Sequence, residues 1–459
     1  MRYLGIKGGR YGKFRAVRAV LAACFLGMVL LTGCGKAVEG ENMLTPGDGS
    51  GRNPEAGGTA LQEMEVELDR EEAAVGPAGE AGDELPGDLS GKSGEKVPGS
   101  PVGESRGTAA ALEPESPEIT LVMVGDILLH TPVAESGRLA EGGYDFSALF
   151  GEVKEKIAAA DLALVNQEVI IGGEELGVSG YPCFNAPYEL GDALAETGFD
   201  VVLHATNHAL DKGKKGLVNC LGFWQEKHPE MEVLGIHDSQ ASQDEVYVYE
   251  QEGIRLAVLN YTYGTNGISL PEDMPYGVDL LDRDRVAADL RKARELADFV
   301  IVCPHWGTEY VLEAGADQKD WAAFMADNGA DLILGTHPHV IEPMEWTGGS
   351  EGEGALVYYS LGNFVNWTSG TGDGVANRMV GGMASLTIGL DDTGTAVVTS
   401  YGVEPLVCHV EQGFGGVRVY PLDSYTEELA SRNEIVKQDG NFSLEYCRNL
   451  ADRVFGLLQ

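Results

Sequence analysis

Five short apolar runs in the chain each lead into side chains that can bind a metal ion. Each run has four to six mostly aliphatic residues and is followed closely by Asp, Glu, Asn or His. The side chains concerned are Asp126, Glu168, Asn207 with His208, His305, and His337 with His339. One such ending carries little information, but five endings drawn from the same residue types indicate a shared site.

The donor types narrow the chemistry of that site. Imidazole, carboxylate and amide donors without a thiolate favour Zn, Fe, Mn or Ni over a structural cysteine-bound zinc. Six or seven donors exceed one tetrahedral site and fit two ions bridged by a carboxylate. Two ions about 3.5–4 Å apart can hold a phosphoryl or acyl centre and provide hydroxide near neutral pH. We therefore expect two divalent transition metal ions, of the Mn, Fe or Zn class, as cofactors.

The surrounding pattern predicts an α/β fold that would bring these side chains together. Strands are expected at 119–124, 161–165, 199–203, 299–303 and 331–334, and helices at about 145–160, 188–197, 214–227, 283–297 and 318–329. Later runs at 355–360, 383–388 and 396–403 have the alternation typical of antiparallel strands, and 422–459 is expected to be largely helical. In open α/β sheets, ligands bind at the carboxyl ends of the strands, where all five candidates lie.

Six short segments in a fixed order resemble the CapA family of poly-γ-glutamate capsule synthesis proteins. They are GDILLH (125–130), NQE (166–168), NHALDKG (207–213), HWGTEY (305–310), GTHPHV (335–340) and YSLGNF (359–364). That family is similar to the calcineurin-like metallophosphoesterase superfamily. The resemblance covers about residues 119–405 and implies a four-layer mixed β-sandwich flanked by helices, followed by a partly helical extension at 406–459.

The resemblance also assigns roles within the site. One metal ion would be held by Asp126, Glu168 and His339, and the other by Glu168, Asn207, His305 and His337, with Glu168 as the bridge. His208 would protonate the leaving group, oriented by Asp211. Two departures stand out: Ile127 and Leu128 replace the usual Asp-x-His histidine, so that the nearest histidine is His130, and Asn166-Gln167-Glu168 replaces Gly-Asp-x-x-Asp. We assign supporting roles to His130, Asn166 and Asn363.

Several of these residues also have an ordinary structural interpretation. Asp126 and Asp211 could each cap a helix, and Asn207 could cap a turn. His305 could pack against Trp306, and His208 could position the substrate instead of donating a proton. These alternatives remain open at the level of the sequence.

The first 34 residues predict export with a lipid anchor. A basic segment precedes a 13-residue apolar stretch at 19–31, which is too short for a comfortable membrane span and is typical of a signal peptide. Leu31-Thr32-Gly33-Cys34 resembles the bacterial lipobox, in which the cysteine receives a diacylglycerol. A plain signal peptide or a short membrane anchor is the alternative. We expect the protein to be lipid-anchored on the extracytoplasmic face of the cell membrane.

The chain as a whole is strongly acidic, with 72 acidic against 32 basic residues and a net charge of −40. Residues 35–118 are rich in acids and contain no aromatic residue, which predicts a disordered tether. The net charge argues against nucleic acid as a partner, because such proteins carry a basic surface. It also means that an anionic substrate needs a local positive centre, which metal ions can supply.

Together with the resemblance, these observations predict a surface lipoprotein acting in poly-γ-glutamate capsule synthesis, export or anchoring. Its substrate would be an anionic polymer or a phosphoester, and its partners would include the membrane and capsule-synthase membrane proteins. The expected chemistry is metal-dependent hydrolysis or transfer at a phosphoryl or acyl centre. A non-catalytic assembly or polymer-binding role on the same fold is the main alternative, and hydrolysis of an unrelated small phosphoester is another.

Overall fold

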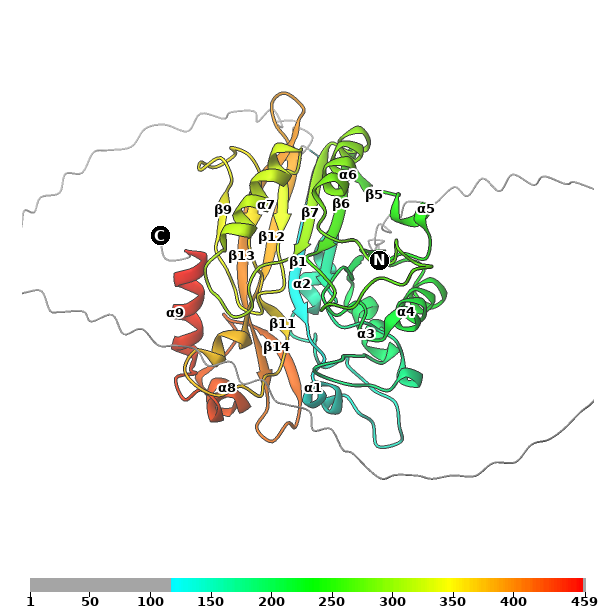
Figure 1. The fold of residues 1–459 in the computed structure, drawn as a ribbon. Coiled ribbons are helices and arrows are strands. Elements are labelled where there is room, and N and C mark those ends of the chain that lie inside the picture. The colour runs from blue at the N-terminus through cyan, green and yellow to red at the C-terminus, as the bar shows by residue number, and fades with distance from the viewer. Residues whose placement is uncertain (1–116, 457–459) are drawn as a thin grey trace, which may run out of the picture. The chain divides into compact units, whose positions relative to one another are not determined.

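In the computed structural model, residues 117–456 are described, and they form two β-sheets with helices packed around them (Figure 1). The first sheet has 8 strands in the order β14-β13-β12-β1-β2-β3-β4, with β11 paired to β1. The second has 6 strands in the order β5-β6-β7-β8-β10-β9. The strands are β1 (Glu118–Ile127), β2 (Leu162–Asn166), β3 (Val201–Leu203), β4 (Glu232–Leu234), β5 (Tyr247–Gln251), β6 (Ile254–Thr262), β7 (Phe299–His305), β8 (Leu332–Leu334), β9 (Met344–Trp346), β10 (Leu356–Tyr358), β11 (Asn363–Val365), β12 (Val380–Leu390), β13 (Ala396–Val410) and β14 (Val417–Pro421).

Both sheets are mixed: the first is parallel from β1 to its β4 edge and antiparallel from β12 to its β14 edge, and the second has a parallel centre with two antiparallel edge strands. In the first sheet, β1 pairs in parallel with β2 and β11 but antiparallel with β12. In the second, β6, β7, β8 and β10 are parallel neighbours, and β5 and β9 are antiparallel edge strands. The parallel strands end at the same edge of each sheet, so residues that follow them are brought together.

Strand β7 shows how the layers pack. Its side chains alternate between two faces, as in any extended strand. Ile301 and Cys303 lie in the core between the sheets, where Cys303 Sγ is 3.9 Å from Met123 Sδ of β1. Val300 and Val302 belong to a second cluster with residues of α6 (Arg283–Leu296) and α7 (Ala316–Asp327). The layers around β7 are therefore the first sheet, the second sheet, and then helices α6 and α7.

Helix α6 begins where the sequence provides a cap and buries one face. The Asp282 carboxylate accepts a 2.9 Å hydrogen bond from the Arg285 backbone N–H, which satisfies one of the free donors of the first turn. Val286, Leu290 and Ala293, spaced three or four residues apart, are its buried residues. The apolar spacing and the cap together explain why this segment is helical.

The remaining α-helices have between 4 and 15 residues. They are α1 (Thr131–Ser136), α2 (Lys154–Ala159), α3 (Tyr188–Thr197), α4 (Gly213–Lys227), α5 (Gln240–Gln243), α8 (Glu427–Arg432) and α9 (Leu444–Phe455), with 3-10 turns η1 (Glu174–Leu176), η2 (Val375–Met379) and η3 (Glu434–Lys437). The Phe364 ring of β11 lies 5.4 Å from Phe150 and 6.2 Å from Phe199, which ties the segments beside α2 and α3 to the first sheet. Within residues 117–456, no helix has the length and apolar character needed to cross a bilayer.

These observations confirm the predicted α/β class with two mixed sheets and flanking helices. The five strands expected before the candidate ligands are present as β1, β2, β3, β7 and β8. The prediction of a helix at 145–160 is wrong over most of that range, because only α2 is helical there. Gly151 disfavours a continuous helix, and Phe146, Leu149, Phe150 and Val153 are buried through successive turns instead. Residues 1–34 and most of the expected tether lie outside the described residues.

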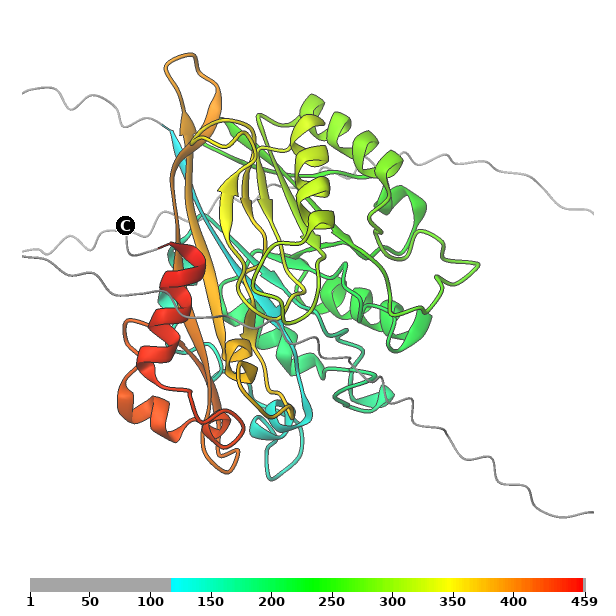
Figure 2. The same ribbon diagram turned by 60° about the vertical axis from the view of Figure 1, so that its left-hand side comes forward.

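The segment after residue 405 is joined to the first sheet. Strand β13 continues to Val410, and β14 pairs with it antiparallel. Helix α9 begins at the Ser443 cap, whose hydroxyl accepts from the Tyr446 N–H at 3.0 Å. Figures 1 and 2 both show α9 beside β13, and the two elements are in contact. The tail thus contains α8 and α9, and part of it extends the first sheet.

Candidate metal centre

The parallel strands deliver the candidate ligands to one place. Asp126 lies near the end of β1, opposite Asn166 on β2 and Asn363 on β11. His305 is the last residue of β7 and forms a bridge with Thr336, which follows β8. Because the two sheets pack face to face, residues at the ends of β1 and β2 meet those that follow β7 and β8.

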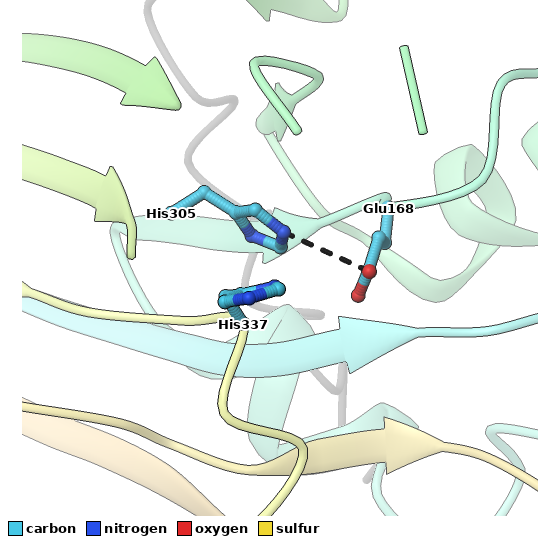
Figure 3. A group of neighbouring side chains, drawn as sticks. All are labelled: Glu168, His305 and His337. Atoms are coloured by element: carbon cyan, nitrogen blue, oxygen red, sulfur yellow. Dashed lines mark ion pairs between the residues drawn. The ribbon is translucent and has the colours of Figure 1, made fainter. Parts of the chain in front are cut away.

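The predicted ligands fall into two groups that share Glu168. One group is Asp126, Glu168 and His339, and the other is Glu168, His305 and His337 (Figure 3). Within each group, one donor atom per residue lies within 4.8 Å of the others. Asn207 Oδ1 lies 3.0 Å from His305 Nε2, beside the second group. The structure thus brings the six predicted ligands close to one another.

Glu168 is buried between histidines of the two groups. Its side chain has no exposed surface, and Oε1 lies 3.7 Å from His305 Nε2 and 3.6 Å from His339 Nε2. Neither carboxylate oxygen has a hydrogen-bond partner, and His337 Nδ1 also has none. Leaving such buried groups unpaired costs about 1–3 kcal/mol each, and more for a charged group.

These unpaired atoms fit metal ions. Both Glu168 oxygens and His337 Nδ1 lack a hydrogen-bond partner within the protein, and divalent ions among the two groups would provide one for each of them. The donor set of imidazole, carboxylate and amide oxygen suits Zn, Fe or Mn. The residues present therefore fit a metal site.

The loop that carries His337 and His339 is strained. Both residues have positive φ values, 100° and 58°, a region that residues other than glycine seldom adopt. Each such residue costs about 1–3 kcal/mol and persists only when its surroundings hold it. The His337 N–H donates to Asp126 Oδ2 at 3.2 Å, and Asn363 Nδ2 donates to the His339 carbonyl at 2.8 Å. Strain held in place at a cluster of donors is typical of a functional site.

The electrostatics of the cluster differ from residue to residue. Burial alone would raise the pKa of Glu168, but His339 and His305 outweigh it and hold the pKa below its usual range. Burial, and then the charge of Glu168, raises the pKa of Asp126. For His339, the effect of burial is outweighed by Glu168 and Asp126, which raise the pKa to about 9. Burial and the two neighbouring histidines hold the pKa of His337 well below its usual value, so its imidazole is neutral.

His208 and Asp211 form a buried pair at the edge of the cluster. His208 Nδ1 donates to Asp211 Oδ2 at 2.7 Å, and the same oxygen accepts from the Phe184 N–H at 2.7 Å. The Phe184 ring packs edge-on against His208, with centroids 4.7 Å apart. A carboxylate that holds Nδ1 fixes the ring and leaves Nε2 as the nitrogen that can exchange a proton with a ligand. The pair is therefore fixed through Nδ1, and proton transfer by Nε2 stays a prediction.

The supporting residues occupy different positions. Asn166 Nδ2 donates to Asp126 Oδ1 at 2.8 Å, and Asn363 Oδ1 lies 3.1 Å from His339 Nδ1, so each contacts a candidate ligand. His130 is in none of the ligand groups found among the described residues. Its ring packs on Phe184, and burial, followed by the charge of His339, lowers its pKa to about 4. The four other histidines, 204, 228, 237 and 409, each contact a structural partner.

Several residues at the site were not predicted from the sequence. Glu309 forms a third group with His337 and His339; its position four residues after His305 in HWGTEY was the available signal. Asn266 Oδ1 accepts from Asn207 Nδ2 at 3.3 Å, from a loop that has no sequence motif. The rings of Tyr263 and Tyr310 lie 4.7 Å from His337 and 6.0 Å from His339, respectively.

The shared position of Glu168 predicts how metal binding depends on it. We expect Glu168→Gln to reduce the metal content of the purified chain from about two ions to less than one, because both groups lose a charged ligand. Metal content would be measured by mass spectrometry after loading with Mn²⁺, Fe²⁺ or Zn²⁺ and gel filtration. Glu342→Gln is the matched control, because Glu342 is also buried with an unpaired oxygen but belongs to no ligand group of the described residues. Equal metal content in Glu168→Gln and wild type would contradict the shared-ligand geometry.

The raised pKa of His339 predicts a pH dependence of metal affinity. Below a pKa of about 9 the imidazole is protonated, and a metal ion must displace that proton to bind. We therefore expect affinity to increase by up to about tenfold per pH unit between pH 6 and 9, and less steeply above pH 9. Competition with a calibrated chelating dye measures this slope. An affinity that does not change between pH 6 and 9 would show that His339 is not a ligand that must lose a proton.

Comparison with known proteins places these residues in a family. The family described as bacterial capsule synthesis protein PGA_cap matches residues 120–368. The PGA biosynthesis protein CapA of Bacillus subtilis (strain 168) is 33% identical over 180 residues, which cover 38% of this chain and 45% of that protein. The capsule biosynthesis protein CapA of Bacillus anthracis is 28% identical over 268 residues, covering 55% and 62%. The matched region thus spans about half the length of these relatives.

Two solved structures with weaker similarity are 5′-nucleotidases. A putative 5′-nucleotidase from Staphylococcus aureus is 14% identical with a TM-score of 0.38, covering 62% of this chain and 54% of that chain. A 5′-nucleotidase precursor from Thermus thermophilus is 16% identical with a TM-score of 0.39, covering 74% and 60%. The family match covers more than half of the 459 residues and contains all six candidate ligands. The chain therefore belongs to the bacterial capsule synthesis protein PGA_cap family.

Proposed function

We propose that this protein is a metal-dependent hydrolase or transferase that acts at a phosphoryl or acyl centre during capsule synthesis. The observation that carries the proposal is Glu168, whose two buried oxygens accept no hydrogen bond and lie between two groups of imidazole and carboxylate donors. A site kept only for structure has no need of a buried carboxylate without hydrogen bonds. Such groups are normally paired, and exceptions are concentrated at functional positions.

The chain's own residues account for substrate positioning and proton transfer. When bound, two divalent ions supply positive charge that stabilises an anionic transition state and lowers the pKa of a water molecule. His208 stands beside this cluster with Nδ1 fixed by Asp211, so its Nε2 can deliver a proton to a leaving oxygen or nitrogen. Asn207 and Asn266, linked at 3.3 Å, hold the segment that carries His208.

The relatives support a role in making a capsule of the poly-γ-glutamate type. Two of them are named for PGA biosynthesis and capsule biosynthesis. The proposed substrate is thus an anionic polymer, or a phosphoester that arises during its synthesis, export or anchoring. Membrane proteins that synthesise the capsule polymer are the proposed partners, and no nucleic acid is involved.

We also propose that the protein is held at the outer face of the cell membrane by a lipid on Cys34. The support is the basic segment, the short apolar stretch and the lipobox-like sequence. We expect cells grown with a labelled fatty acid to incorporate label into the wild-type protein but not into Cys34→Ala. Equal labelling of the two forms would exclude this anchor.

A non-catalytic role in capsule assembly is the second candidate, and one observation favours it. The chain lacks the usual Asp-x-His histidine, and His130 does not replace it in either ligand group. An incomplete site could bind metal and polymer without turning over a substrate.

Leaving-group dependence separates these candidates and tests the role of His208. The metal-loaded chain would be assayed on p-nitrophenyl and alkyl phosphodiesters and on γ-glutamyl amides. We expect hydrolysis that is abolished by chelation. In His208→Ala, kcat should fall about 10²- to 10⁴-fold for substrates with poor leaving groups, which need protonation, and less for p-nitrophenolate.

His228→Ala serves as the matched control, because His228 pairs with Asp192 outside the ligand groups of the described residues. An equal loss for good and poor leaving groups in His208→Ala would exclude proton donation. If the metal-loaded wild type hydrolysed none of these substrates, the non-catalytic candidate would be favoured.

A further inference from the structure

An arginine that the family match does not include lies close to the metal-ligand groups. Arg378 is in η2, ten residues beyond the end of the matched segment at residue 368. Among the ion pairs between described residues, none involves Arg378, whereas Arg138 and Arg255 each pair with a carboxylate at 2.7 Å. Arg291, Arg448 and Arg453 also have no ion pair among the described residues, so it is the position of Arg378 over Tyr310, beside His339, that sets it apart.

The Arg378 guanidinium is held flat against an aromatic ring. Its Cζ lies 3.5 Å from the centroid of the Tyr310 ring, and Nη1 donates to Thr368 Oγ1 at 2.8 Å. A guanidinium has five N–H donors, and this is its one side-chain hydrogen bond within residues 117–456. Tyr310 is 46% exposed, so the stacked pair lies at the surface of the site, where a ligand can reach it.

Tyr310 and Arg378 are both tied to His339. Tyr310 has a φ of 68°, and its N–H donates to the Pro338 carbonyl at 2.8 Å, between the two histidines of the strained loop. Asn363 Nδ2 donates to the carbonyls of both His339 and Arg378, at 2.8 and 2.9 Å. One amide group thus connects the backbone of a candidate metal ligand to that of the arginine.

The C-terminal segment holds the loop that carries Arg378. Asp439 Oδ2 accepts from the Gly374 and Ala376 N–H groups at 2.8 and 3.2 Å. Tyr446 of α9 donates its hydroxyl hydrogen to Asn377 Oδ1 at 2.6 Å. The position of the guanidinium therefore depends on residues far along the chain, outside the segment that defines the family.

We propose that Arg378, stacked on Tyr310, is a specificity-determining residue that binds a carboxylate or phosphate group of the substrate beside the metal ligands. A guanidinium can bind two oxygens of one oxyanion at once, and stacking on a ring fixes its orientation beforehand. The acidic chain repels anions at long range, so a fixed positive group at the site is what an anionic substrate requires. This inference rests on the proposed function, because it names the substrate group that the same site selects.

Anion binding to the full chain tests the proposal directly. Titration calorimetry would follow inorganic phosphate and glutarate, a dicarboxylate, with metal-loaded and with chelator-treated protein. We expect Arg378→Met to weaken binding of at least one probe about 10- to 100-fold, with Arg378→Lys between Arg378→Met and wild type. The probe that loses affinity identifies phosphate or carboxylate as the recognised group.

Arg138→Met is the matched control. Arg138 also lies over a tyrosine ring, 4.8 Å from the Tyr144 centroid, but it is already paired with Glu135. We expect this variant to bind both probes as the wild type does. Unchanged binding of both probes in Arg378→Met, with metal content preserved, would overturn the proposal.

A second measurement needs no variant and covers the case in which Arg378→Met does not fold. Phenylglyoxal modifies accessible arginines, and mass spectrometry can locate the modified residue in the wild-type chain. Phosphate or glutarate should protect Arg378 and not Arg138; equal modification of Arg378 with and without both anions would overturn the proposal. If an anion protects Arg378 from modification in chelator-treated protein, the inference is supported even when no hydrolysis is found. If the protein hydrolyses a substrate but no anion protects Arg378, the proposed function stands and the inference fails.

Discussion

A single buried carboxylate imposes the main constraint on this structure. Glu168 has no exposed surface and no hydrogen-bond partner for either oxygen, and it lies within 3.7 Å of nitrogens from His305 and His339. Burial of a charge that accepts no hydrogen bond is costly, so the protein must offset it. Without metal, the protonated imidazole of His339 provides that offset, and two bound ions would provide a stronger one.

The fold supplies a rigid frame for this constraint. Asp126, Asn166 and His305 lie on strands of two sheets whose inner faces share one core, so their backbones have little freedom to move. The more strained residues, His337 and His339, come from the loop after β8, which is held by hydrogen bonds from its own N–H to Asp126 and from Asn363. Rigid strands thus place the site, and a strained loop closes it.

Much of this arrangement could be predicted from the sequence. Asp126 and His305 follow strongly apolar runs, and the carboxyl ends of parallel strands lie at the same edge of a sheet. Their proximity could therefore be predicted from the sequence alone. The prediction of a helix at 145–160 was wrong because turns around Gly151 bury the same apolar side chains equally well. Asn266, Tyr310 and Arg378 could not be predicted, because each reaches the site from a loop or a 3-10 turn whose course is fixed by distant contacts. For Arg378 those contacts come from Asp439 and Tyr446, more than sixty residues later.

The two ligand groups differ in how far their donor atoms already have hydrogen-bond partners within the protein. On the Asp126 side, both carboxylate oxygens already have partners: Asn166 donates to one and the His337 N–H to the other. On the other side, His337 Nδ1 has no partner, so an ion there would satisfy more unpaired atoms. The atoms that would gain most from an ion therefore gather around Glu168, His305 and His337.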